Sequence, residues 1–228
     1  MNDIAENLAA IAENIANAAV ANSRNPGDIT LVAVSKTHPR EVVEKALAAG
    51  QRVFGENKIQ EAVLKFIPPI HGVELHMVGH LQSNKTRPAA ALFDRIHSID
   101  SLKTARRLDK HLQECGRTMK ALVQVNVAME DQKSGVSGKE LPSLLEGLAE
   151  LQYLKTDGLM ILPPFFDDPV ESVPYFRKLR ELRDSLTGRF GIDLQHLSMG
   201  MTNDYAEAIA EGATFIRVGT AIFGQRRY

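Results

Sequence analysis

Apolar and polar positions along the chain follow two different periods. Eight short runs are rich in apolar and β-branched residues, which is typical of buried strands. Most of the segments between them repeat apolar residues at helical spacing instead. Strands that alternate with helices in this way are typical of parallel β/α units. The expected strands are residues 29–35, 52–55, 74–79, 95–99, 121–128, 156–162, 196–200 and 215–219.

About eight such units in 228 residues predict an α/β fold, a single-domain (β/α)8 barrel of the TIM type. The alternative is a doubly wound open sheet, which differs in that its last strand does not pair with its first. Glycines such as Gly50, Gly116 and Gly212 follow expected helices, as a helix stop signal does. No low-complexity linker or shift in composition divides the chain, so we expect one domain over residues 1–228.

The first 22 residues precede the first expected strand. Ile4, Leu8, Ile11, Ile15 and Val20 recur there at roughly helical spacing, which predicts an amphipathic helix. We expect this extra helix, residues 1–22, to pack on the barrel and to cover its bottom. The segment lacks the basic start and apolar centre of a secretory signal, so it does not predict export.

The composition argues against several classes of protein. Its 27 basic and 28 acidic residues give a net charge of −1, which offers no electrostatic case for a nucleic-acid or anionic-membrane partner. The lone cysteine, Cys115, excludes an internal disulfide and fits a reducing compartment. No apolar run is long enough to cross a bilayer. We therefore expect a cytoplasmic protein, and the balanced charge of a single barrel fits a monomer.

A lysine, Lys36, stands directly after the first apolar strand. Barrel enzymes carry their chemistry where strands end, which gives such a position weight. The side chain could extend its ammonium group to solvent, or it could serve as a Schiff-base nucleophile or phosphate partner, and Lys36 alone does not decide between these. No metal site is expected, because His76 and His80 lie on a strand and a loop without a third ligand nearby.

Two loops near the C-terminus form a candidate anion site. Gly200 stands in the turn after the seventh strand, and Asp204 and Glu207 have the spacing of a capping box at the next helix. The last strand ends in Gly219 and Thr220. Barrel enzymes frequently bind phosphate at the loops after strands seven and eight, so these two weak signals support each other.

Arg217 lies within the last apolar strand. An arginine in such a strand is costly without a partner. Its partner is expected to be either an acidic residue at a strand end or a ligand at the mouth of the barrel.

Six motifs of the chain resemble the pyridoxal 5′-phosphate homeostasis protein family. They run in order from about Leu31 to Gly224, and the closing motif is long and specific. Proteins of that family form a single-domain barrel similar to the N-terminal domain of bacterial alanine racemase. They bind pyridoxal phosphate and have no well-established catalytic activity. The motifs are AVSKTHP, FGENKIQEAVLK, HMVGHLQSNK, KSGV, DGLMILPP and LSMGMTNDYAEAIAEGATFIRVGTAIFG.

The resemblance implies roles for individual residues. Lys36 would form a Schiff base with the cofactor, Asn57 would lie beside its ring, and Arg217 would face the pyridine nitrogen. Thr202 stands where the family usually has serine, and its hydroxyl group is retained. The residues implied to hold the phosphate are Ser198, Gly200, Met201, Thr202, Gly219 and Thr220.

The resemblance implies storage, buffering or delivery of pyridoxal phosphate rather than catalysis, with apo forms of pyridoxal-phosphate-dependent enzymes as candidate recipients. Arginine stays protonated, so the pyridine nitrogen would stay unprotonated and the ring would be a weaker electron sink. Racemases of similar fold take a catalytic tyrosine from a second domain, which we do not expect here because the chain ends at Tyr228. The alternative is a racemase-like enzyme of the same fold with Lys36 as one base.

Overall fold

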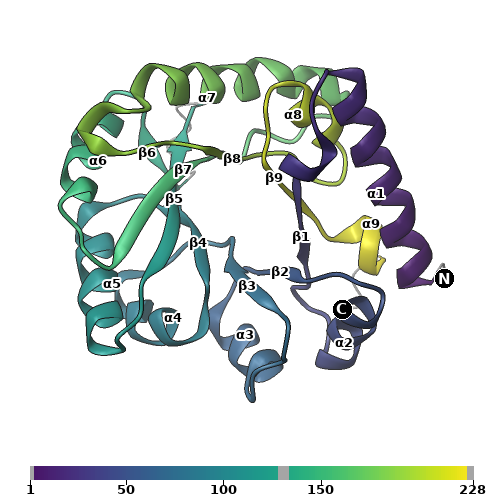
Figure 1. The fold of residues 1–228 in the computed structure, drawn as a ribbon, viewed down its shortest axis with the longest axis horizontal. Helices are drawn as coiled ribbons and strands as arrows, with labels where there is room; N and C mark the ends of the chain where they lie inside the picture. The colour runs from purple at the N-terminus through teal and green to yellow at the C-terminus, as the bar shows by residue number, and fades with distance from the viewer. Residues whose placement is uncertain (1–2, 128–133, 225–228) are drawn as a thin grey trace.

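The computed structural model describes residues 3–127 and 134–224, and within these residues eight parallel strands form a barrel (Figure 1). A further two-residue strand, β6 (Val136–Ser137), pairs with β5 outside the ring. The barrel strands are β1 (Thr30–Val34), β2 (Val53–Glu56), β3 (Glu74–Met77), β4 (Arg95–Ile99), β5 (Met119–Asn126), β7 (Leu154–Met160), β8 (His196–Ser198) and β9 (Phe215–Val218).

Two strand pairings show that the ring is closed. The last strand, β9, pairs in parallel with β1, where Val32 lies opposite Arg217. On the other side of the ring, β4 pairs with β5, where Arg95 lies opposite Lys120. The barrel expected from the alternation of periods is thus confirmed. The open-sheet alternative is wrong, because the last strand pairs with the first.

The helices surround the barrel and follow the strands in sequence (Figure 1). Gly50 and Gly116 follow two of them with φ of 98° and 64°, which confirms the glycine stop signals there. The helices are α2 (Arg40–Ala48), α3 (Ile59–Phe66), α4 (Thr86–Leu92), α5 (Leu102–Glu114), α6 (Leu141–Ala149), α7 (Val173–Leu186), α8 (Tyr205–Ala210) and α9 (Thr220–Phe223).

The N-terminal helix α1 (Ile4–Ala21) stands in this outer ring, against α8, α9 and α2 (Figure 1). The expectation that it covers the bottom of the barrel was wrong. The helix after the last strand, α9, has only four residues, which leaves room in the ring beside β9 and β1. The apolar stripe of α1 fills that room, and it consists of Leu8, Ile11, Ile15 and Ala19. The placement of Val20 in this stripe was wrong, because its side chain is 68% exposed.

Most of the core lies between the strands and the helices. A smaller cluster includes Val32, Leu122, Met160 and Phe215. Buried polar side chains share the barrel strands with these apolar residues, and the site is built on part of this polar set. They include His76, Arg95, His97, Asp157, Ser198 and Arg217.

In the ranges 3–127 and 134–224, no helix is both long and apolar enough to span a membrane. The same residues contain no group of three or more His, Cys, Asp or Glu side chains placed to hold a metal ion. Lys133, which begins the KSGV motif, and Tyr228 lie outside the described residues.

Candidate functional site

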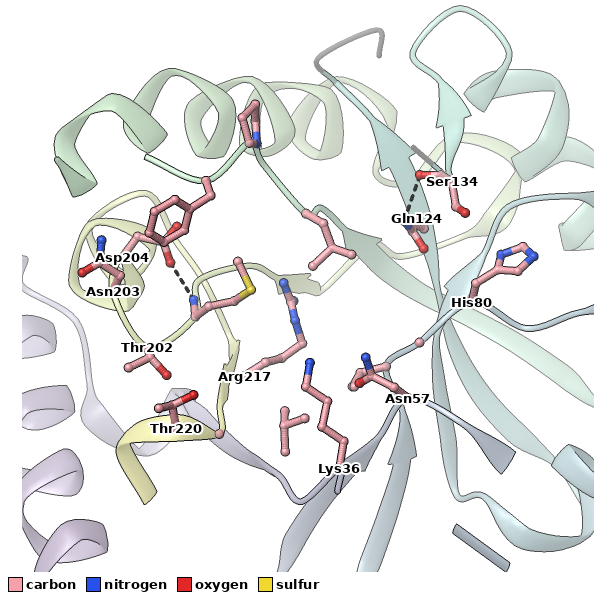
Figure 2. A pocket seen from close by; sticks show the side chains of 18 of the residues that line it. Lys36, Asn57, His80, Gln124, Ser134, Thr202, Asn203, Asp204, Arg217 and Thr220 are labelled. Atoms are coloured by element: carbon pink, nitrogen blue, oxygen red, sulfur yellow. Dashed lines mark hydrogen bonds between the residues drawn. The ribbon is translucent and has the colours of Figure 1, made fainter. Parts of the chain in front are cut away.

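A cavity of about 760 Å³ lies at the C-terminal end of the barrel strands (Figure 2). Strand-end loops that are far apart in sequence contribute to its wall, as expected for a parallel barrel. Seven of the nine site residues expected from the sequence line this cavity. They are Lys36, Asn57, Met201, Thr202, Arg217, Gly219 and Thr220.

Lys36 stands just after β1, and helix α3 holds the backbone on both sides of it. The ammonium group of Lys65 donates to the carbonyl oxygen of Ser35 (2.6 Å), and the N–H of Thr37 donates to Glu61 Oε2 (3.1 Å). Thr37 has a φ of 67°, which a β-branched residue rarely adopts. Because such strain persists only where the surroundings impose it, these contacts define how the Lys36 side chain leaves the rim.

A buried ion pair lies beside this turn. Lys65 Nζ is 2.6 Å from Glu56 Oε1, and the same oxygen accepts a hydrogen bond from the Ser35 hydroxyl (2.6 Å). Burial raises the pKa of Glu56, and the nearby ammonium group of Lys65 opposes that rise. Lys65 is thereby bound to Glu56 and Ser35, whereas Lys36 lines the cavity.

Arg217 extends from β9 into the cavity wall and is only 4 % exposed. Its guanidinium group donates to Ser198 Oγ and to the carbonyl oxygen of Ile161 (2.9 Å). Burial lowers its pKa to about 10, so it remains protonated at neutral pH. Both of these acceptors are uncharged. Among the described residues, no carboxylate forms an ion pair with Arg217, and the charge of Asp204 only partly opposes the fall in its pKa. The ion pair with a strand-end acid, one of the two expected partners, is therefore not observed there.

The loop between β8 and α8 turns sharply at Gly200, whose φ is 89°. A Cβ atom there would lie 2.6 Å from the Cβ of Ala208 and 2.9 Å from the Cα of Tyr205, so only glycine fits. The capping box expected for this helix was wrong. Within the described chain, the Asp204 side chain makes no capping hydrogen bond to α8, and its Oδ1 accepts one from the N–H of Met201 (2.7 Å).

Two loops bring hydroxyl groups together on one rim of the cavity. Thr202 follows β8, whereas Gly219 and Thr220 follow β9, and Figure 2 shows the two threonine hydroxyls pointing toward each other. Among the described residues, none accepts a hydrogen bond from the backbone N–H of Thr202 or Asn203. Hydroxyl groups and unpaired backbone N–H groups are the usual ligands of a phosphate, so this rim can hold one.

The remaining two expected site residues lie behind the wall. Ser198 is fully buried and bonds to His97 and Arg217, and Gly200 accepts a hydrogen bond from the N–H of Arg217 (3.0 Å). Neither of them is among the residues that line the cavity. Both act on the site through Arg217, and the shape of the loop also depends on Gly200.

Sequence reasoning missed one wall of the cavity and the residues beneath it. Leu162 and Phe165 line the cavity after β7, and both are exposed at its mouth. The consecutive prolines that follow this apolar strand were the available signal for an irregular wall segment. His97 was also missed, although a histidine within the apolar run 95–99 already requires a buried partner.

Comparison with known proteins places the chain among relatives of similar length. The family described as "Alanine racemase, N-terminal domain" matches residues 7–227. The chain is 42% identical to a "Pyridoxal phosphate homeostasis protein" of Pseudomonas aeruginosa, covering 100% of this chain and 98% of that one. It is 41% identical to the protein of the same name from Escherichia coli, covering 100% and 99%.

Solved structures of similar fold agree with these sequence relatives. PipY of Synechococcus elongatus, described with pyridoxal phosphate bound, has a TM-score of 0.86 at 39% identity and covers 97% of this chain and 100% of its own. An alanine racemase of Clostridium difficile has a TM-score of 0.71 at 15% identity, which shows the shared fold alone. With these matches over nearly its whole length, the chain belongs to the pyridoxal phosphate homeostasis proteins, within the alanine racemase N-terminal domain family.

Proposed function

We propose that this protein binds pyridoxal phosphate in the cavity at the end of the barrel and serves in the homeostasis of that cofactor. The observation that carries the proposal is the arrangement of Lys36, Arg217 and the hydroxyls of Thr202 and Thr220 around one cavity. The names of the curated relatives and the pyridoxal phosphate bound in the related PipY support it.

The residues present fit the chemistry of pyridoxal phosphate. An aldehyde requires an amine, which Lys36 offers as its covalent anchor. A phosphate dianion requires several donors, which the rim of Thr202, Gly219 and Thr220 offers. An unprotonated ring nitrogen accepts a hydrogen bond, and Arg217 is a donor that stays charged. The cavity volume of about 760 Å³ lies in the range of small-molecule sites.

Arg217 argues for holding the cofactor rather than for strong carbanion chemistry. When bound, pyridoxal phosphate supplies an aldehyde and a ring that can accept electrons. Arg217 has only donors to offer and cannot supply the negative charge that would keep a ring nitrogen protonated. We therefore propose storage or delivery, with apo pyridoxal-phosphate-dependent enzymes as recipients. The balanced charge of the chain fits a monomer, and sedimentation velocity tests that.

The first experiment is a visible spectrum of the protein with pyridoxal phosphate. We expect an absorbance band that borohydride abolishes, leaving the pyridoxyl group on the peptide that carries Lys36. Lys36→Ala should lose this band, whereas Lys58→Ala should keep it, because the Lys58 side chain is 72% exposed and does not line the cavity. A wild-type protein that takes up no pyridoxal phosphate contradicts the proposal. Activation of an apo-enzyme by the loaded protein then separates delivery from storage.

A further inference from the structure

A chain of hydrogen bonds crosses the barrel from its N-terminal end to the cavity. Glu74 is the first residue of β3, its side chain is 52% exposed, and its Oε1 lies 2.8 Å from His76 Nε2. His76 Nδ1 is 3.0 Å from His97 Nε2, and His97 Nδ1 is 2.8 Å from Ser198 Oγ. Ser198 Oγ in turn accepts a hydrogen bond from Arg217, which lines the cavity.

When both histidine rings are neutral, the two ends of this row of hydrogen bonds fix the direction of every hydrogen bond in it. A guanidinium group can only donate and a carboxylate can only accept. Ser198 therefore accepts from Arg217, and its own hydroxyl hydrogen goes to His97 Nδ1, since the described residues offer it no other acceptor. His97 then donates from Nε2 to His76, and His76 donates from Nε2 to Glu74. In this arrangement both rings are neutral and carry their hydrogen on Nε2.

The electrostatic surroundings favour these protonation states. The pKa of His97 lies well below its ordinary value, first because of burial and then because His76, Arg217 and Arg95 disfavour a further positive charge. Burial also lowers the pKa of His76, which the carboxylate of Glu74 only partly opposes. The hydrogen bond from His76 lowers the pKa of Glu74. At neutral pH this row of hydrogen bonds therefore runs from the cation of Arg217 through the Ser198 hydroxyl and two neutral imidazoles to the anion of Glu74.

We infer that Glu74 orients Arg217 from the opposite end of the barrel, with His76, His97 and Ser198 as positioning residues between them. The carboxylate sets the tautomers of both histidines, so that the Ser198 hydroxyl turns toward His97 and leaves a lone pair for the guanidinium group. The hydrogen bonds then hold the remaining donors of Arg217 toward the cavity. The inference rests on the proposed function only for the identity of the ligand, pyridoxal phosphate.

The substitution Glu74→Gln separates this inference from a purely structural role for the chain. Glutamine keeps the shape and one acceptor oxygen, but its amide can turn and donate to His76 Nε2 instead. The direction of the hydrogen bonds between Glu74 and Ser198 could then reverse, so that His97 Nδ1 and Arg217 both donate to Ser198. The Ser198 hydroxyl hydrogen would have no acceptor, and the hold on Arg217 would weaken.

The direction of the hydrogen bonds through His76 and His97 can be measured without cofactor, by NMR of ¹⁵N-labelled histidine rings. At pH 7 we expect His76 and His97 to be neutral with the hydrogen on Nε2, and Glu74→Gln to shift part of the population to Nδ1. Glu41→Gln, which removes an exposed charge from α2, should change neither ring. A charged ring, an Nδ1–H tautomer in the wild type, or tautomers unaffected by Glu74→Gln overturns the inference.

Binding of pyridoxal phosphate measures the effect on the site. We expect Glu74→Gln to weaken binding about fivefold, as for the loss of one hydrogen bond, and to change the pH dependence of the absorbance of the bound cofactor. His196→Asn is a matched control, because His196 also packs on Phe215 (4.9 Å between ring centroids). Within the described residues, it forms no hydrogen bond to any residue of the row from Glu74 to Arg217. Equal affinity and an unchanged spectrum in Glu74→Gln overturn the inference. If the wild type binds no pyridoxal phosphate, the proposed function fails, and the NMR result still decides the direction of the chain.

Discussion

Gly200 shows how one residue can govern the shape of the site. It turns the chain between β8 and α8 in a left-handed conformation, and its neighbours Ala208 and Tyr205 leave no room for a side chain. The loop that it shapes carries Met201 and Thr202 to the cavity. Gly116 also has a positive φ (64°), but no atom lies within 4 Å of the position of its missing Cβ. The two glycines therefore differ in packing and not in backbone class.

We expect Gly200→Ala to lower the free energy of unfolding by about 2–4 kcal/mol, from left-handed strain and from overpacking. Gly116→Ala should cost only about 1 kcal/mol, because it adds the strain without the clash. Urea unfolding of both variants measures the difference. Gly200→Ala should also weaken the binding of pyridoxal phosphate, whereas Gly116→Ala should not. Equal losses of stability in the two variants would show that packing at Gly200 contributes nothing.

At the scale of elements, helix α1 completes the outer ring and supports the last loop of the site. It packs against α9, whose first residue, Thr220, lines the cavity. The Asn7 side-chain amide donates to the carbonyl oxygen of Ile222 in α9 (2.9 Å), and Arg24, just after α1, donates to the carbonyl oxygen of Ile209 in α8 (2.8 Å). The N-terminal helix and the residues just after it therefore hold the two C-terminal helices, α8 and α9.

Ile15→Ala tests this role, because Ile15 is 6% exposed in the apolar stripe of α1. We expect a loss of about 2–5 kcal/mol in the free energy of unfolding, from lost burial and from the cavity left behind. Val20→Ala on the same helix is the matched control, since Val20 is 68% exposed and should change stability by less than about 0.5 kcal/mol. Denaturant titrations compare the two, and similar losses would mean that α1 is not packed as described.

At the scale of the whole molecule, three histidine rings gather around one phenylalanine on the barrel strands. The rings of His76, His97 and His196 surround the ring of Phe215, at 5.7, 5.2 and 4.9 Å between centroids. Burial is the main cause that lowers the pKa of all three. The charged groups that act on these rings are Glu74, Asp94, Arg95, Lys120, Asp157, Asp193 and Arg217.

This arrangement predicts that acid destabilises the fold. Between the lowered pKa of a buried histidine and the unfolded value of about 6.5, the unfolded state binds the extra proton, so stability falls as pH falls below about 6.5. The slope is up to about 1.4 kcal/mol per pH unit for each proton taken up. Glu56 contributes in the opposite direction, because burial raises its pKa. Urea midpoints at pH 7.5 and 5.5 test this, and a flat dependence contradicts it.

Particular residues show how far sequence reasoning reached. Lys36 and Arg217 were identified because a charged residue on or beside an apolar strand requires an explanation, and both line the cavity. Ser198 was assigned to the phosphate, although it lies behind Arg217 and bonds to His97. The alternation of side chains along a strand predicts which face of the sheet a serine lies on. It does not predict which buried side chain its hydroxyl group binds. Asp204 was expected to cap α8, but it holds the preceding loop instead.

The sequence by itself determined the number and order of the β/α units and the strand ends that carry the candidate site residues. Those features follow from local periodicity and turn residues, which act over a few positions along the chain. Only the tertiary structure decided that β9 closes onto β1, that α1 stands in the outer ring, and that His97 meets Ser198, 101 positions away. Such contacts depend on the closure, stagger and tilt of the whole barrel, which no local pattern records.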